Sequence, residues 1–407
     1  MVDDKFFDVA AWRAADRKLM LAKLNKEVPR LRIGLWTIDS GIAPVDLYTY
    51  LYARFGAPNG FGMTLKSASS DNLLHWHWSL QYEEHIIELM GHTLTAQVAA
   101  EGSGDPSPED VERLVNSLKA DFANHREGMS RERRRLERWT VFINPHCRIQ
   151  RVVGRFIERL QELDIRNVQL PRGPRSDEEM KLFPDRMENC IKVYSEALGL
   201  CTSLRMLAPV LAESFVNLVI FVLVHTSTRE DSRLYDSLFR QEVDVRVRAL
   251  HLTCAGFRKP VDVKDERFKA FQTLMLHRND FLHGNIVPER LAFREVYFDG
   301  VIPLPKEYEN MAELALVHSL KHVEPETALA DIGIVNGLIA LVLEAMHEAP
   351  ALAVQEFMRT LDPGWRKDEK RPGILFPPNI VFTYAGRRVP DEEEGSAAPQ
   401  GNLSPSE

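Results

Sequence analysis

The 407-residue sequence contains few cysteines, and they lack the spacing by which cysteines usually act together. No C-x-x-C pair is present, which argues against a disulfide framework and against a cysteine-rich zinc site. The four cysteines are Cys147, Cys190, Cys201 and Cys254. This usage favours a reducing compartment, so we expect a cytoplasmic protein.

Two further patterns are missing. The first twenty residues lack a basic segment followed by an apolar core, so we expect no signal peptide. No G-x-x-x-x-G-K-[ST] phosphate loop occurs, which argues against a P-loop nucleotidase.

The longest apolar run, 207–225, carries Glu213, Ser214 and Asn217 and is barely long enough to span a bilayer. We therefore predict a buried bundle helix there and no membrane partner.

The composition is that of a soluble globular protein. Hydrophobic residues make up 44% and charged residues 27% of the chain, with a formal net charge of −8. A chain of this length is too long for one ordinary hydrophobic core, so two or three domains are expected.

The first 105 residues alternate between helical and strand-like periods, which predicts an α+β domain with an antiparallel sheet and of unknown function. Amphipathic patterns predict helices over about 5–26 and 44–56. Strand-like runs lie at 31–38, 60–68, 72–82, 85–91 and 93–100.

One of these runs contains the letters HWHW at 75–78. Two histidines two apart on a strand share a face and could hold a zinc ion completed by His85 or His92. No third ligand lies at a fixed spacing, however. Trp76 and Trp78 lie on the opposite, apolar face of the strand, which we expect to face the core. We expect His75 and His77 to lie on a solvated polar face, and we predict no metal site and no cofactor.

An arginine-rich stretch follows the first domain. Ser107 and Pro108 mark a helix start after a linker at 101–107, and we assign 106–183 as a helical connector. Residues 126–175 contain 13 arginines, no lysine and six acids, a local charge of +7. This is the largest charge asymmetry in the chain.

Four of the arginines recur at three- and four-residue spacing and predict a stripe along one helix: Arg148, Arg151, Arg155 and Arg159. Apolar residues between them, from Ile149 to Leu163, form the opposite face. Because guanidinium groups match phosphates bidentately and stack on bases, the stripe suggests a nucleic-acid contact surface. The alternative is an ordinary solvated face paired with acids elsewhere.

Residues 184–348 read as a helical bundle. Helices are expected at about 185–205, 207–226, 231–256, 264–283 and 325–348, with an irregular or strand-like insert near 290–310. A C-terminal extension over 349–388 and a disordered acidic tail over 389–407 complete the chain.

The segment HRNDFLHGN, 277–285, ends one of these helices and gathers three polar groups. Asn279 and His283 are four residues apart and share a helix face, so the amide can orient the imidazole. Arg278 and His283 lie about 140° apart around an ideal helix and roughly 7.5 Å along it. The arginine is long enough to reach the same space, so the three could converge on one phosphate.

This segment resembles the signature of the HEPN superfamily (higher eukaryotes and prokaryotes nucleotide-binding), in which an arginine and a polar residue precede a histidine by a few positions. The matching residues are Arg278, Asn279 and His283. Glu213 and Asn217 are similar to the polar pair that such proteins often place on a bundle helix facing the motif. The resemblance covers about 185–348.

The spacing alone is weak, because the chain contains a second Arg-to-His match from Arg246 to His251. Only the first has an asparagine after its arginine and a glycine, Gly284, after its histidine. A purely structural alternative is that Arg278 and His283 bond the last carbonyls of the helix, with Gly284 ending it.

The resemblance implies a metal-independent endoribonuclease. His283 would take the proton of a ribose 2′-hydroxyl, and Arg278 would stabilise the phosphorane. It also implies RNA as substrate, a homodimer, and a role as a toxin or phage-defence effector held by an antitoxin or sensor. Two alternatives stay open: a non-catalytic HEPN module that binds nucleic acid, nucleotide or protein, and a helical interaction protein outside this family.

Overall fold

A computed structural model describes residues 4–16, 18, 20, 21, 33–65, 72, 74–83, 85–93, 95–101, 106–171, 173–292, 294–306, 316–321 and 323–376; at 279–282 and 290 it describes the backbone alone. The chain divides into two compact units, the first containing residues 1–140 and the second residues 141–374. The mixed α and β content expected from the sequence is confirmed.

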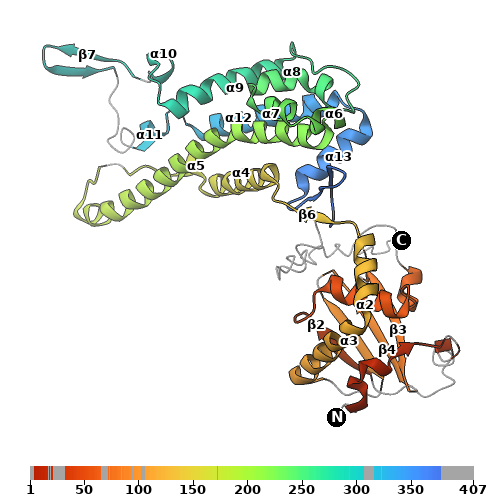
Figure 1. The fold of residues 1–407 in the computed structure, drawn as a ribbon. Coiled ribbons are helices and arrows are strands. Elements are labelled where there is room, and N and C mark those ends of the chain that lie inside the picture. Colours follow the sequence, from red (N-terminus) through yellow and green to blue (C-terminus); the bar gives the residue numbers. More distant parts are fainter. Residues whose placement is uncertain are drawn as a thin grey trace, which may run out of the picture. The chain divides into compact units, whose positions relative to one another are not determined.

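The first unit is built on a five-stranded antiparallel sheet in the order β1-β3-β4-β5-β2. Its strands are β1 (Arg13–Ala14), β2 (Ile33–Ile38), β3 (Trp76–Tyr82), β4 (His85–Gly91) and β5 (Ala96–Glu101). Helices α2 (Pro44–Phe55) and α3 (Pro108–Arg135) pack together and share its core (Figure 1). The core contains Trp36, Trp78, Leu51 and Leu114, none of them measurably exposed.

Two expectations for this unit are wrong. The described part of the stretch 5–26 begins with two short 3-10 helices, η1 (Asp4–Phe7) and η2 (Val9–Ala11), and then enters β1. The run 60–68 forms the 3-10 helix η3 (Phe61–Leu65) in its described part. The N-terminal segment is apolar because Phe6, Phe7 and Val9 belong to the core of the first unit. A search for periodicity confuses such a segment with a regular helix.

The connector assigned to 106–183 is divided between the two units. Helix α3 starts at the predicted Ser107, whose side chain and that of Asp110 form a capping box, and it buries Leu114 and Leu118 in the first core. Helix α4 (Pro145–Glu162) belongs to the second unit instead. The boundary lies after Thr140 rather than near residue 105, because the apolar face of α3 finds its partner in α2.

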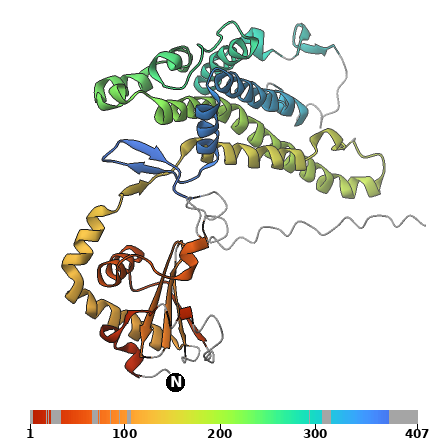
Figure 2. The same cartoon turned by 90° about the vertical axis from the view of Figure 1, so that its right-hand side faces the viewer.

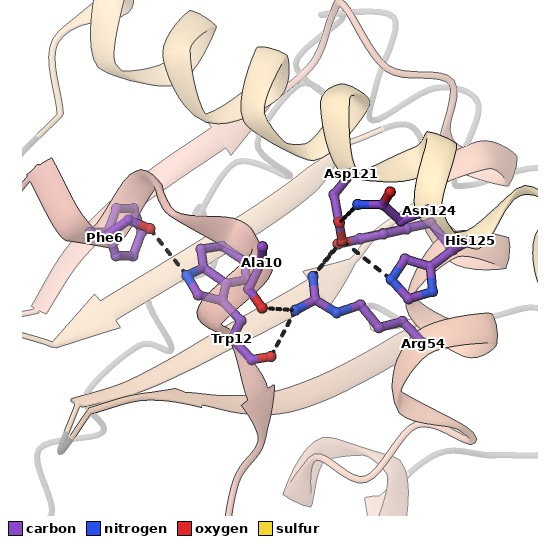
Figure 3. A network of polar contacts seen from close by, with 8 residues as sticks. Phe6, Ala10, Trp12, Arg54, Asp121, Asn124 and His125 are labelled. Carbon is purple, nitrogen blue, oxygen red and sulfur yellow. Dashed lines mark hydrogen bonds and ion pairs between the residues drawn. The ribbon is translucent and has the colours of Figure 1, made fainter.

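A buried ion pair ties the N-terminal segment to α2 and α3 (Figure 3). Arg54 donates to Asp121 Oδ2 at 2.7 Å and to the carbonyl oxygens of Ala10 and Trp12 at 2.9 and 2.8 Å. Tyr50 donates its hydroxyl to the same carboxylate at 2.6 Å. The guanidinium is thus satisfied on several sides by groups of this unit, which indicates a structural role.

The second unit is a helical bundle around the 47-residue helix α5 (Asp177–Leu223), which contacts α4, α9 (Glu266–His283) and α12 (Pro325–Glu344). Shorter helices complete it: α6 (Thr226–Glu230), α7 (Ser232–Arg240), α8 (Val243–Thr253), α10 (Pro288–Leu291), α11 (His318–Leu320) and α13 (Glu348–Arg359). Strands β6 (Trp139–Val141), β9 (Gly364–Arg366) and β10 (Arg371–Gly373) form a small sheet. The insert near 290–310 contains the hairpin of β7 (Val296–Asp299) and β8 (Ile302–Pro305).

Helix α5 contains the apolar run that raised the question of a membrane span. In the described part of the chain, α5 and the segment His318–Glu344 are long and apolar enough to cross a bilayer by composition. Phe215, Val216 and Val219 of α5 are fully buried in the bundle core. This is the packing predicted for a bundle helix. The predicted tail at 389–407 lies outside the described residues.

His146, in the first turn of α4, is buried against α5 with an exposed fraction of 1%. Its Nδ1 lies 3.0 Å from the hydroxyl oxygen of Ser214, which itself donates to the carbonyl of Leu211. Its Nε2 is buried without a hydrogen-bond partner in the described part of the chain. Burial lowers the pKa of His146 to about 4, so the side chain is neutral in the fold.

This burial predicts a loss of stability in mild acid. The unfolded chain binds the proton below its ordinary pKa of 6.5, whereas the folded chain resists it down to about 4, so stability falls as pH falls through this window. Between pH 7 and pH 5 the loss should be about 2 kcal/mol. Urea unfolding of wild type and His146→Gln at pH 7 and pH 5 tests this prediction, because the free energy of unfolding of the variant should fall less between the two pH values. An equal pH dependence in both proteins would contradict the assignment.

Candidate functional site

The predicted motif lies at the C-terminal end of α9, in the second unit. Arg278 is half-buried, and its Nε is buried without a hydrogen-bond partner in the described part of the chain. His283 is the last residue of α9 and is exposed. The side chain of Asn279 lies outside the described atoms, so the expected contact between its amide and His283 stays a prediction.

Gly284 ends the helix directly after His283. Its φ of +63° lies in the left-handed region, which glycine enters at little cost and most residues avoid. Among the described atoms, none lies within 4 Å of the position that a β-carbon would occupy there, so the glycine is explained by backbone conformation and not by crowding. The glycine therefore fits the helix-ending role, while the motif histidine beside it projects at an exposed end.

A pocket of about 980 Å³ adjoins this helix end. It is bounded by α9, α5, α12 and the segment after α9, and Gly284 and His277 contribute to its wall, whereas Arg278 and His283 do not. Its lining is mostly apolar, with the side chains of Leu274, Ile286 and Ile334 among others. An apolar wall that also carries several polar side chains is typical of sites for small molecules.

The polar residues of this pocket come from α5, α9 and α12 and from the segments that follow α9 and precede α12. Arg205 donates through Nε to Asp331 Oδ2 at 2.9 Å, and both side chains are mostly buried. Lys321, Glu324 and Thr327 lie nearer the start of α12 and also face the pocket. The sequence analysis did not select any of these residues. Arg205 and Asp331 are 126 positions apart, so no local pattern could have paired them.

The polar pair on α5 does not contact the motif arginine that we expected. Glu213 Oε1 accepts a hydrogen bond from Arg246 at 2.6 Å, and Asn217 Oδ1 accepts another from the same guanidinium. Arg246 is on α8 and is only 4% exposed. The expectation that Glu213 and Asn217 face Arg278 is therefore corrected: the arginine they hold belongs to the second Arg-to-His match.

Helix geometry explains why the polar pair contacts Arg246 and not Arg278. Gln272 of α9 donates to Asp244 of α8, so the first half of α9 lies level with α8. Arg278 is six residues further along α9, about 9 Å away, toward the level of the pocket. Glu213 is eight residues beyond Arg205 on α5, about 12 Å toward α8. The polar pair and the motif thus lie at different heights of the bundle.

The second match is a structural element. The side chain of Arg246 is 3% exposed, which leaves it no access to an external phosphate. His251 is half-buried, and its Nδ1 lies 3.0 Å from the carbonyl oxygen of Arg248. Burial thus distinguishes the two arginines: Arg246 is enclosed in an ion pair, whereas Arg278 is half-buried and precedes the exposed His283.

The arginine stripe is present on α4, and all four arginines are exposed. Val153 and Leu160 on the opposite face are buried in the bundle core. Arg159, however, forms a two-pronged contact with Glu196 at 2.6 and 3.1 Å and also bonds Glu162. These contacts raise its pKa and neutralise part of its charge. The exposed face is confirmed, but its most C-terminal arginine is already paired.

Most of the HWHW segment is buried rather than solvated, and His75 is half-buried. His77 on β3 is 8% exposed; its Nε2 lies 2.7 Å from Glu88 Oε2, and its Nδ1 accepts from the backbone of Gly62 at 3.1 Å. The segment around η3 covers this face. A β-carbon on Gly60 would lie 2.3 Å from the His77 ring, so only glycine permits this approach. The expectation of a solvated face is wrong because a distant loop packs on it.

His75 and His77 face separate partners. His75 Nε2 lies 2.9 Å from the Thr93 hydroxyl, while the carboxylate of Glu88 is shared by His77 and Ser79. Among the residues that the structure describes, no three histidine, cysteine or acidic side chains are grouped to hold a metal ion. The two histidines are thus held by hydrogen bonds to the sheet and to the segments beside it.

Comparisons of the chain with protein-family models, with curated proteins and with solved structures find no significant match.

Proposed function

We infer that the second unit is a HEPN-type, metal-independent endoribonuclease that cuts RNA at the end of α9. One observation carries this proposal. The match from Arg278 to His283, which has the HEPN-like context, lies at an accessible helix end beside a pocket of about 980 Å³. The Nε of Arg278 is buried without a hydrogen-bond partner in the described part of the chain. The other match is occupied by an internal ion pair.

The chemistry follows from the two side chains. His283 takes the proton of a ribose 2′-hydroxyl, and the freed oxygen attacks the adjacent phosphorus. The bond to the 5′ oxygen breaks, that oxygen takes up a proton from water, and His283 returns its proton to water. Arg278 donates hydrogen bonds to the phosphorane, whose charge is greatest in the transition state. The products are a 2′,3′-cyclic phosphate and a 5′-hydroxyl, and a dimer with two motifs at one cleft is the expected assembly.

The neighbouring pocket offers room for an unstacked base, because its wall is largely apolar and its polar side chains can bond base edges. A role as toxin or phage-defence effector, with an antitoxin or sensor as partner, would fit such an activity. The five-stranded unit would then be the part that senses or restrains the nuclease.

A non-catalytic HEPN module is the second candidate. It is favoured by one observation: the pocket is lined by His277 and Gly284, and neither Arg278 nor His283 reaches it. Such a module would bind nucleic acid, nucleotide or a protein segment in the pocket and leave it uncut. Incubation of the purified chain with mixed RNA in EDTA, followed by analysis of fragment ends, separates the two, since binding without fragments favours the module.

The arginine stripe gives a separate prediction about binding. Replacement of Arg148 and Arg155 by glutamine should weaken RNA binding and flatten its salt dependence by about 1.4 units of log K against log salt, because each phosphate contact with a single strand contributes ~0.7. Arg159→Gln is the matched control, since Glu196 and Glu162 already hold that guanidinium. Fluorescence anisotropy over a salt series measures the slope. An unchanged slope in the double variant would return the stripe to an ordinary solvated face.

A further inference from the structure

The hairpin of β7 and β8 has exposed apolar side chains on both faces. All eight strand residues are exposed, and in Figures 1 and 2 the hairpin stands clear of the bundle helices. Phe298 is 67% and Val301 92% exposed. The large apolar side chains are Val296, Tyr297, Phe298, Val301, Ile302 and Leu304. A lone two-stranded hairpin is marginally stable in water, so this one needs a partner.

The register of the hairpin shows which main-chain groups point outward. Asp299 pairs with Ile302 across a two-residue turn that has Gly300 at φ +61°, the first central position of a type II′ turn. The pair that closes such a turn is hydrogen-bonded, and the following pairs alternate. Phe298 opposite Pro303 and Val296 opposite Pro305 are therefore the pairs whose main-chain groups face away from each other.

The prolines of β8 stand at the positions whose main-chain groups point outward, as this alternation requires, and they close one edge of the hairpin. Pro303 and Pro305 have no N–H, so the outer edge of β8 cannot donate to another strand. The outer edge of β7 has no such block. The outward N–H and C=O groups of Val296 and Phe298 make no hydrogen bond to the described part of the chain. One edge of the hairpin is thus open and the other is closed.

We propose that β7 pairs with β7 of a second copy of this chain, antiparallel about a twofold axis, to form a four-stranded sheet across a homodimer. Antiparallel pairing through the outward groups places Val296 of each copy opposite Phe298 of the other. The N–H and C=O groups of both residues are then hydrogen-bonded in each strand. Tyr297 then lies on the axis, opposite itself. A twofold contact is self-complementary, so one open edge per chain is enough.

The side chains beside the pairing favour this occupant. Tyr297 and Phe298 are 57% and 67% exposed, and in the four-stranded sheet they lie next to the same residues of the second copy. Aromatic neighbours on adjacent strands stabilise a sheet. Because the two hairpins are identical, their apolar faces continue from one copy to the other.

Disulfide trapping tests the register. In the proposed pairing, Tyr297 and its copy form a non-hydrogen-bonded pair with Cα atoms about 4.5 Å apart, within disulfide range. The native cysteines are all buried, so Tyr297→Cys adds one exposed thiol. Mild oxidation should give a covalent dimer. Val301→Cys is the control, because residue 301 is more exposed yet would lie on the order of 25 Å from its copy.

Two substitutions at one position test the edge itself. Val296→Pro removes an outward N–H and leaves the hairpin intact, as the prolines of β8 do, whereas Val296→Ala keeps the N–H and removes only part of a side chain. Sedimentation should find wild type and Val296→Ala at twice the 46.5 kDa of one chain, and Val296→Pro at the mass of one chain.

A monomeric wild type, a dimer in Val296→Pro, a monomer in Val296→Ala, or cross-linking at residue 301 as efficient as at 297 would each overturn this proposal. The inference does not rest on ribonuclease activity. Loss of RNA cleavage with an intact dimer would defeat only the function proposed above. A monomer that cuts RNA would defeat the dimer, and with it the assembly expected for the nuclease, but not the cleavage reaction.

Discussion

His283→Ala is expected to lower RNA cleavage by at least about 100-fold while leaving the fold and RNA binding largely intact, since a positioned general base contributes about 10²–10⁴-fold. The fold should tolerate the change because His283 is exposed at the end of α9. Arg278→Ala should have nearly the same effect on rate, because the charge it stabilises exists mainly in the transition state. Asn279→Ala should cost less, through loss of imidazole orientation only.

The matched control is His251→Ala, at the other Arg-to-His match, which should cut RNA as wild type does. Wild-type activity should survive EDTA and leave 2′,3′-cyclic phosphate and 5′-hydroxyl ends, measured by gel mobility and end-labelling. Fragments with 5′-phosphates, a magnesium requirement, or full activity in His283→Ala would contradict the ribonuclease proposal. Binding to RNA without any cleavage would leave the non-catalytic module.

Arg246→Met is expected to destabilise the second unit by about 3 kcal/mol, at the lower end of the cost of breaking a buried ion pair. The substitution leaves Glu213 and Asn217 facing an apolar side chain, and Glu213 keeps some access to water. Arg278→Met should change stability by less than about 1 kcal/mol, because it breaks no ion pair in the described part of the chain. Urea unfolding followed by circular dichroism measures both.

A double substitution checks the cause. Adding Glu213→Met to Arg246→Met should restore part of the lost stability, because no unpaired charge then remains against the core. If the double variant is less stable than Arg246→Met alone, the ion pair is not the origin of the effect. Equal losses in Arg246→Met and Arg278→Met would remove the distinction between a structural and a functional arginine.

Local patterns predicted the elements that depend on local physics. Alternating apolar residues identified β3, β4 and β5, and the apolar and arginine-bearing faces of α4 were evident from three- and four-residue spacing. Ser107 and Pro108 marked the start of α3 because capping involves only neighbouring residues. In the motif, the sequence found the helix, its exposed histidine and the glycine that ends it.

Contacts between distant segments were beyond this approach. His77 was expected in solvent, but the segment at Gly60 and Gly62 covers it. Nothing in the spacing of Glu213 and Asn217 reveals that Arg246 rather than Arg278 lies level with them, since that depends on how α8 and α9 stack along α5. The pair Arg205 and Asp331 likewise meets only after the bundle has formed.

The sequence by itself determined the mixed first unit, the helical second unit, the arginine face of α4 and a motif at the end of α9, because periodicity, capping and turn chemistry act over a few residues. Only the tertiary structure decided which arginine is buried in an ion pair and which stays accessible, where the boundary between the units falls, and that one hairpin edge is open while the other is closed. These depend on burial, and burial is a property of segments that meet from far apart in the chain.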